Sequence, residues 1–126
     1  MIKLTFVLRR RSELEPAEFR RYWREQHAPL VAGHAETLRI RRYVQTHPVD
    51  SDLNGPLADA RGALVEPYDG VAELWWDSFE DLLAVLSDEA GQRAAAELLE
   101  DERRFIDLPA CSLWLGEEIE VVKNRG

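Results

Sequence analysis

The 126-residue sequence contains a single cysteine, Cys111, and no apolar run near the roughly 20 residues that span a bilayer. A lone cysteine excludes an internal disulfide, and no export signal is visible, so we expect a cytoplasmic protein. The net charge of −8 argues against nucleic acid and anionic membranes as partners. A hydrophobic content of 45% and a charged content of 32% favour a globular chain, and the length predicts one domain over residues 1–126.

Several chemistries lack their motifs. The sequence has no glycine-rich phosphate loop, no dinucleotide fingerprint and no serine nucleophile elbow. None of its three histidines has a metal-ligand spacing to another ligand, so we predict no metal site. Residues 1–47 carry ten Lys and Arg against five Asp and Glu. This asymmetry indicates either complementary elements within one fold or a basic rim that attracts an anionic small molecule.

Alternating apolar and polar residues predict four strands, with a helical region after the first and after the third. The order strand–helix–strand–strand–helix–strand is typical of the α+β ferredoxin-like fold (βαββαβ), a four-stranded antiparallel sheet with its helices on one face. The other face would carry Trp75 or Trp76, which is too apolar for water. We therefore expect a homodimer that closes sheet to sheet into an α/β barrel. The expected strands cover residues 2–8, 38–46, 71–76 and 110–122.

Two helical regions are expected. The first begins at Pro16, and a kink or an end is expected near Ala28 because Pro29 removes one helical hydrogen bond. The second region divides into a short helix capped by Ser78 and a longer helix from about residue 88 to 106. Residues 48–67 form a long connection rich in Asp, Gly, Asn and Pro. A loop of this length indicates a functional lid or a mobile segment.

One face of the first helix carries polar groups that a core normally avoids. A buried polar group without a partner costs on the order of 1–3 kcal/mol, so we expect these groups to have partners or a function. His27 is the candidate for proton transfer because histidine titrates near neutrality, and a helix that ends at Pro29 would favour its cationic form. The alternative is a buried histidine bonded only to a backbone carbonyl. The face comprises Phe19, Tyr22, Trp23, Gln26, His27 and Leu30.

A carboxylate on the apolar stripe of the last helix is the second candidate. Asp101 shares this stripe with Leu98 and Phe105. It could orient a histidine, accept a proton itself with a raised pKa, or pair with an arginine. The residue pattern leaves these three roles open.

Two neighbouring strands supply the third group. Tyr43 and His47 share one side of their strand, and Glu73 and Trp75 share one side of theirs. The strand register decides which side faces the helices, and it cannot be derived from the pattern. Trp75 and Trp76 point to opposite faces, so we expect one to line a pocket and the other to pack in the dimer.

Three segments, in order, resemble the motifs of the EthD-like family of the dimeric α/β-barrel superfamily. They are YWREQHAPL at residues 22–30, YDGVAELWWDS at residues 68–78, and DE with FID at residues 101–107. With the strand order, the likeness covers nearly the whole chain. It implies a dimeric ferredoxin-like fold, a small hydrophobic or aromatic ligand, and relatives that include cofactor-free monooxygenases, isomerases, cyclases, dehydratases and decarboxylases. It specifies the fold better than the reaction.

We predict a cofactor-independent enzyme acting on a small aromatic or polyketide-like compound bound between the sheet and the helices. His27 would move a proton, assisted by Asp101 or Tyr43. From the family alone, a monooxygenase (oxidoreductase) ranks first, and a dehydratase, cyclase or decarboxylase follows closely. The alternatives are a non-catalytic hydrophobe-binding accessory protein of a degradation or biosynthetic pathway, and a structural dimer with a filled core.

The predicted ligand contacts come from the first helix, the two central strand segments and the last helix. Three of them, Phe19, Trp23 and Trp75, are expected to sandwich the ligand. The full set is Phe19, Tyr22, Trp23, Gln26, His47, Glu73, Trp75 and Phe105.

Overall fold

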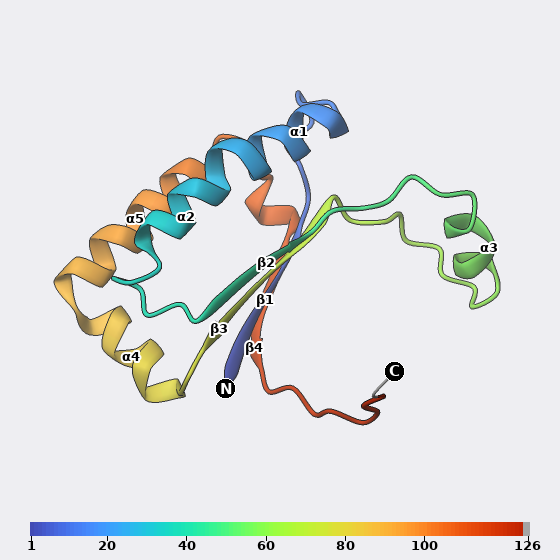
Figure 1. The fold of residues 1–126 in the computed structure, drawn as a ribbon. Helices are drawn as coiled ribbons and strands as arrows, with labels where there is room; N and C mark the ends of the chain where they lie inside the picture. The colour runs from blue at the N-terminus through green and yellow to red at the C-terminus, as the bar shows by residue number, and fades with distance from the viewer. Residues whose placement is uncertain (125–126) are drawn as a thin grey trace.

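The structure, a computed structural model that describes residues 1–124, contains a four-stranded antiparallel sheet with its long helices on one side (Figure 1). The strand order is β2-β3-β1-β4, so β3 and β1 are the central strands. This order confirms the predicted ferredoxin-like α+β fold. The strands are β1 (Ile2–Leu8), β2 (Arg42–Thr46), β3 (Gly70–Trp76) and β4 (Ser112–Gly116).

The two edge strands are shorter than the alternating pattern predicts. β4 pairs with β1 from Val7↔Ser112 to Lys3↔Gly116, and β1 begins one residue before Lys3. Residues 117–122 therefore have no strand to bond, and the predicted extension to residue 122 was wrong. β2 pairs with β3 only from Arg42, since β3 ends at Trp76, and the predicted start at residue 38 was also wrong.

The first helical region is one continuous segment along the sheet (Figure 1). It consists of α1 (Pro16–Tyr22), a π-helical turn η1 (Trp23–His27) and α2 (Ala28–His34). In the π turn, the backbone N–H of Ala28 donates to the carbonyl of Trp23, five residues earlier. Pro29 lies in the first turn of α2, where a missing N–H is tolerated. One of our two alternatives, a helix end near Ala28, was therefore wrong, because the helical segment continues to His34.

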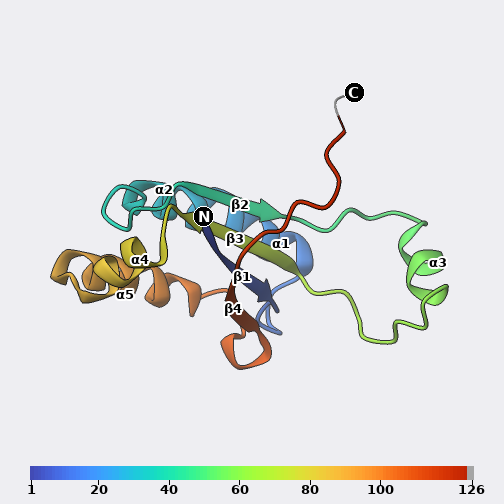
Figure 2. The ribbon, with the colours of Figure 1, turned by 90° about the horizontal axis from the view of Figure 1, so that it is seen from below.

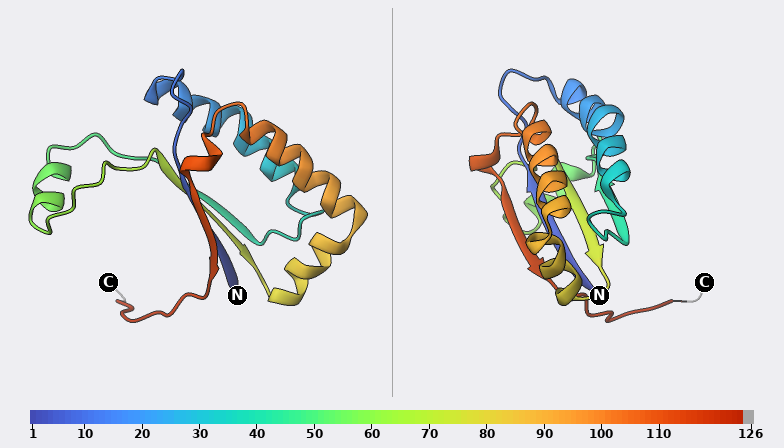
Figure 3. Two further views of the ribbon diagram at one scale, coloured as in Figure 1. Left: turned by 180° about the vertical axis from the view of Figure 1, so that it is seen from behind. Right: turned by 90° about the vertical axis from the view of Figure 1, so that its left-hand side faces the viewer.

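The second helical region is divided as predicted into α4 (Phe79–Ser87) and α5 (Glu89–Glu102). The Ser78 hydroxyl caps α4 by accepting the backbone N–H of Asp81 at 3.1 Å. α5 runs beside α2, and both cover the same face of the sheet (Figure 3). A short 3₁₀ turn, η2 (Leu108–Ala110), leads into β4.

The connection between β2 and β3 forms an arm that projects away from the sheet and carries the short helix α3 (Asn54–Asp59) (Figure 2). The arm is anchored at its base, where Arg9 donates to the carbonyl oxygens of Pro67 at 2.7 Å and Glu66 at 3.1 Å. In the part of the chain that the structure describes, no helix is long and apolar enough to cross a membrane.

The sheet face opposite the helices is more polar than the sequence predicts. Trp75 lies on it but is only 5% exposed, because Lys3 and Arg42 from the neighbouring strands cover its ring. Lys3 also forms an ion pair with Glu73 at 2.7 Å. Trp75 therefore does not supply the exposed apolar surface that was our reason for expecting a dimer, whereas Trp114 of β4, aligned with Thr5 on this face, is 48% exposed. The dimer itself stays a prediction.

Candidate active site

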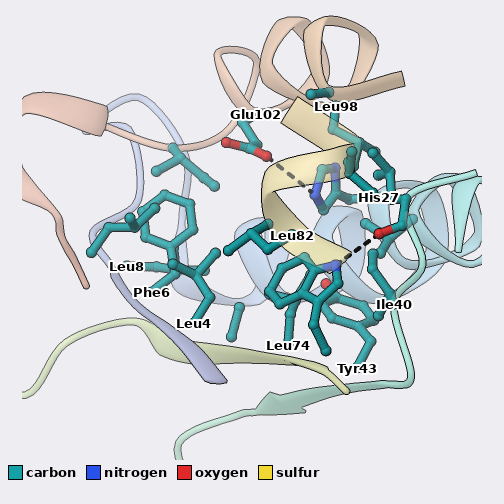
Figure 4. A pocket seen from close by; sticks show the side chains of 18 of the residues that line it. Leu4, Phe6, Leu8, His27, Ile40, Tyr43, Leu74, Leu82, Leu98 and Glu102 are labelled. Atoms are coloured by element: carbon teal, nitrogen blue, oxygen red, sulfur yellow. Dashed lines mark hydrogen bonds and ion pairs between the residues drawn. The ribbon is translucent and has the colours of Figure 1, made fainter. Parts of the chain in front are cut away.

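An apolar cavity with a volume of about 230 Å³ lies between the helices and the sheet (Figure 4). An engineered cavity of about 150 Å³ holds benzene, so this one suits a molecule of one or two rings. Among the described residues, its titratable lining groups are His27, Tyr43 and Glu102, and no lysine or arginine lines it. The wall is otherwise mainly aliphatic and aromatic, including Leu4, Phe6, Leu8, Trp23, Ile40, Leu74, Trp76, Leu82 and Leu98.

His27 is the last residue of the π turn, and its side chain points from the helices into the cavity. The residue is only 5% exposed. Its Nδ1 lies 2.8 Å from Oδ2 of Asp101, and its Nε2 lies 4.0 Å from Oε2 of Glu102. Because a carboxylate only accepts hydrogen bonds, Nδ1 carries the proton and Nε2 has a free lone pair when the ring is neutral.

Burial lowers the pKa of His27, and the neighbouring Asp101 opposes this effect only in part. The neutral imidazole is therefore the main form at neutral pH. Our expectation that a helix end would favour the cation required the helix to stop at Pro29. Because the helix continues to His34, His27 is not at a C-terminus.

Glu102 is the site residue that our sequence reasoning missed. It is the last residue of α5 and lines the cavity beside His27. Burial, and then the negative charge of Asp101, raise the pKa of Glu102 to about 7. A signal was present in the sequence, since Glu102 stands four residues after Leu98 and four before Ile106, on one apolar stripe.

Asp101 does not line the cavity. Its Oδ2 faces His27, and its Oδ1 accepts a hydrogen bond from the Tyr22 hydroxyl at 2.5 Å. Arg104, the nearest arginine partner, is exposed and lies 3.9 Å from Oδ1. Of the three roles left open by the sequence, this geometry fits the orientation of a histidine best.

Tyr43 reaches the cavity from β2, on the sheet side. Its oxygen accepts a hydrogen bond from Nε2 of Gln45 at 2.9 Å, and the same Nε2 donates to the carbonyl of Trp23 at 3.0 Å. Burial raises the pKa of Tyr43, so its hydroxyl keeps its proton at neutral pH. Because the oxygen already accepts a bond, the proton is available to a ligand oxygen.

Two of the predicted ligand contacts from the helices lie behind the cavity wall. Trp23 lines the cavity, whereas Phe19 and Phe105 are fully buried in the adjoining core. The Phe105 ring packs 5.1 Å from the His27 ring, measured between centroids. Phe19 and Phe105 therefore fix the positions of Trp23 and His27 from behind.

Three further predicted contacts lie outside the cavity lining. Tyr22 and Gln26 border a separate groove on the outer surface of the helices. His47 stacks on the far side of Trp23, with ring centroids 4.4 Å apart, and its Nε2 lies 2.8 Å from Oε1 of Gln45. These positions separate the three residues from the cavity that His27 faces.

Glu73 and Trp75 lie on the opposite face of the sheet from the cavity, so the predicted Phe19–Trp23–Trp75 sandwich was wrong. The register aligns Trp75 with Lys3 and Arg42, on the face away from the helices. The neighbouring Trp76 lines the cavity instead, and its Nε1 donates to the carbonyl of Leu38 at 2.7 Å.

Two other sequence expectations concern the surroundings of the cavity. The connection at residues 48–67 contributes no lining residue and projects away from it (Figure 2), so it forms no lid in this conformation. Because no described lysine or arginine lines the wall, a basic rim does not extend into the cavity. Within residues 1–124, no group of three or more His, Cys, Asp or Glu side chains could hold a metal ion.

Comparisons with known proteins point to one family. The EthD domain model matches residues 11–109. The conidial pigment biosynthesis dehydratase EthD of Metarhizium robertsii is 27% identical over 128 residues, which cover 98% of this chain and 87% of that protein.

Two solved structures share the fold. An EthD family protein from Bacillus halodurans C-125 has a TM-score of 0.62 and 19% identity, covering 94% of this chain and 99% of that one. An EthD-like protein from Ralstonia eutropha JMP134 has a TM-score of 0.58 and 19% identity, covering 98% and 96%. Since the domain model matches well over half of the sequence, this chain belongs to the EthD domain family.

Proposed function

We propose that this protein is a cofactor-independent lyase that removes water from a small, uncharged, cyclic hydroxy ketone. The observation that carries the proposal is the pairing of His27 and Glu102 at 4.0 Å on the wall of an apolar cavity. At neutral pH this pair offers a base and an acid together. The Metarhizium robertsii relative is named as a dehydratase, which supports the same reaction class.

His27 is the proposed base. Its Nε2 would take the proton from the carbon beside the ketone, and the Nδ1–H bond to Asp101 holds the ring so that Nε2 faces the cavity. The carboxylate also stabilises the imidazolium that forms during the transfer. Asp101 acts as a positioning residue, and Tyr22 fixes it in turn through a 2.5 Å hydrogen bond.

Glu102 is the proposed acid. A hydroxyl group leaves readily only when it is protonated, and a carboxyl whose pKa is about 7 carries that proton in roughly half of the molecules at neutral pH. On the opposite wall, the Tyr43 hydroxyl would donate to the ketone oxygen and stabilise the enolate. The absence of lysine and arginine from the described lining favours a substrate without a carboxylate or phosphate.

This proposal reverses the order of reactions that the family resemblance alone favoured. Attack of oxygen on a substrate enolate needs a base, whereas loss of water needs a base and an acid. The cavity has both, in His27 and Glu102. A non-catalytic binding protein is the second candidate, since the cavity would hold a one-ring or two-ring hydrophobe without any reaction.

The first experiment is an assay with cyclic β-hydroxy ketones, monitoring the ultraviolet absorbance of the dehydrated product. We expect turnover by the wild type, and a loss of about 10²–10⁴-fold in kcat for His27→Gln and for Glu102→Gln. The matched controls are His34→Gln and Glu97→Gln, which alter an equivalent surface pair. Ligand-induced thermal stabilisation without turnover in the wild type would support the binding protein and contradict the lyase.

We further propose that the protein is a homodimer joined through the sheet face that the helices leave uncovered (Figure 3). Trp114 on β4 is aligned with Thr5 on that face and is 48% exposed, so it offers apolar surface to a second copy. Light scattering coupled to size exclusion is expected to give twice the chain mass of 14.5 kDa. A single-chain mass at micromolar concentration would contradict this proposal.

A further inference from the structure

The acid and the base of the candidate site reach the cavity from the same side. His27 belongs to the π turn and Glu102 to the end of α5, both in the helical layer (Figure 4). The strands form the opposite wall, where Leu4 and Leu74 present apolar side chains and Tyr43 supplies a hydroxyl. A flat substrate between the layers therefore has both proton-transferring groups over one face.

The separation of the two groups leads to the same conclusion. Nε2 of His27 and Oε2 of Glu102 are 4.0 Å apart. If they acted on opposite faces of one molecule, two hydrogen bonds of roughly 2.7–3.2 Å plus the thickness of the ring would have to fit between them. The observed distance is too short for that arrangement. It fits a hydrogen and a hydroxyl on adjacent carbons that project from one face.

We infer that the enzyme removes the proton and the hydroxyl group from the same face of the substrate, a syn elimination. This inference rests on the proposed lyase function and deepens it. It restricts the substrates to β-hydroxy ketones in which the carbon beside the ketone carries a hydrogen on the same face as the hydroxyl. The spacing of two catalytic groups predicts stereochemistry in glycoside hydrolases by similar logic.

The step balances within the site. The C–H bond beside the ketone breaks and its proton moves to Nε2 of His27, while the electron pair forms the new C=C bond. The C–O bond of the hydroxyl breaks, and the carboxyl proton of Glu102 converts the leaving group into water. A gap of 4.0 Å is too long for a direct hydrogen bond, so the released water relays the imidazolium proton to the Glu102 carboxylate, which restores both groups.

A bicyclic β-hydroxy ketone, 3-hydroxy-1-tetralone, is a suitable probe. It has two rings and no charge, and its dehydration product tautomerises to 1-naphthol, which is readily measured. Two samples are prepared with deuterium on the carbon between the ketone and the hydroxyl, one with the label cis to the hydroxyl and one trans. Mass spectrometry of the product and of the recovered substrate gives the fate of the label and corrects for exchange without enzyme.

The expected result is loss of deuterium from the cis-labelled sample and retention in the trans-labelled sample. Loss of the trans label would overturn the syn inference while leaving the lyase function in place. Equal loss of the two labels in the product would do the same, provided that the recovered substrate has lost neither label. Loss of the trans label would instead indicate a proton donor or acceptor on the sheet side, where Tyr43 lies. No naphthol above the enzyme-free rate would overturn the proposed function and the syn inference together.

A variant separates this outcome from a simple folding defect. Glu102→Gln keeps the size of the side chain but removes the transferable proton, so dehydration of both labelled samples is expected to fall together. Exchange of the cis deuterium into water without dehydration is expected to persist, because His27 is retained. If Glu102→Gln, confirmed as folded by circular dichroism, exchanges the trans deuterium instead, His27 acts on the other face and the inference is wrong.

Discussion

Two histidine–carboxylate pairs join the same two helical segments, and they differ mainly in burial. His27 meets Asp101 at 2.8 Å, and His34, two helical turns further along, meets Glu97 at 2.9 Å. The side chains of the first pair are 6% and 12% exposed, whereas those of the second are 22% and 59% exposed. Only the first pair adjoins the cavity and a second carboxyl group. A short hydrogen bond is common to both, so burial and the neighbouring Glu102 distinguish the candidate site.

The largest expected difference between the two pairs is in catalysis. His27→Gln is expected to lower kcat by about 10²–10⁴-fold, because it removes the proposed base. His34→Gln, the matched change in the exposed pair, is expected to leave kcat within about twofold. Steady-state assays of both variants on one substrate test this contrast. Equal losses in the two variants would show that the buried pair has no special role.

The second difference concerns the carboxylates. Asp101→Asn is expected to lower kcat by about 10²-fold or more, because an amide no longer selects the tautomer with the proton on Nδ1. Nitrogen NMR of the imidazole ring should show a mixture of tautomers in this variant. Glu97→Gln is expected to change neither the rate nor the His27 tautomer. An unchanged His27 tautomer in Asp101→Asn would contradict the positioning role.

The sequence predicted the fold well because its signals are local. Alternation, the capping serine at position 78 and the order of elements were enough for the ferredoxin-like sheet and for the division of the second helical region. The strand ends were predicted less well. A strand stops where its neighbour stops, and the pattern of β4 contains no information about where β1 begins.

The site was only partly predictable for a related reason. Helical periodicity placed His27 on the buried face, and Asp101 was identified as a carboxylate on an apolar stripe. Which of Trp75 and Trp76 lines the cavity depends on which face of β3 meets the helices, and alternation alone leaves both possibilities open. Glu102 was overlooked because Asp101 precedes it on the same stripe, and the sequence cannot show which carboxylate reaches the cavity.

The third prediction concerns stability, and its sign depends on pH. Because the pKa of Glu102 is raised to about 7 in the fold, its ionisation destabilises the folded state as pH rises through that value. Glu102→Gln is therefore expected to raise the free energy of unfolding at pH 8, by no more than about 3.4 kcal/mol, since the pKa rises from 4.5 to about 7 and each pKa unit corresponds to about 1.36 kcal/mol. At pH 4, where the carboxyl is largely neutral in both states, little change is expected.

Urea unfolding at the two pH values measures this effect, and Glu97→Gln is the control for a glutamate on the same helix. The control is expected to change stability by less than about 1 kcal/mol at either pH, because its pair is exposed. A lower free energy of unfolding for Glu102→Gln than for the wild type at pH 8 would mean that the ionised carboxylate is favourably paired in the fold.

The smallest effect belongs to the exposed pair itself. A double-mutant cycle of His34→Ala and Glu97→Ala is expected to give a coupling free energy of about 0.2–1 kcal/mol, as is usual for exposed ion pairs. High salt should reduce this coupling further. A coupling well above 1 kcal/mol would show that exposure is a poor guide to the difference between the two pairs.

The central claim is that a neutral base and a protonated acid lie side by side in the cavity at neutral pH. Carbon NMR titration of the Glu102 side-chain carboxyl, assigned by comparison with Glu102→Gln, tests it most directly. The account predicts a midpoint near pH 7, with the His27 ring still neutral through that range. A midpoint near the ordinary glutamate pKa of about 4.3, with an imidazolium at position 27, would describe a static ion pair and contradict the account.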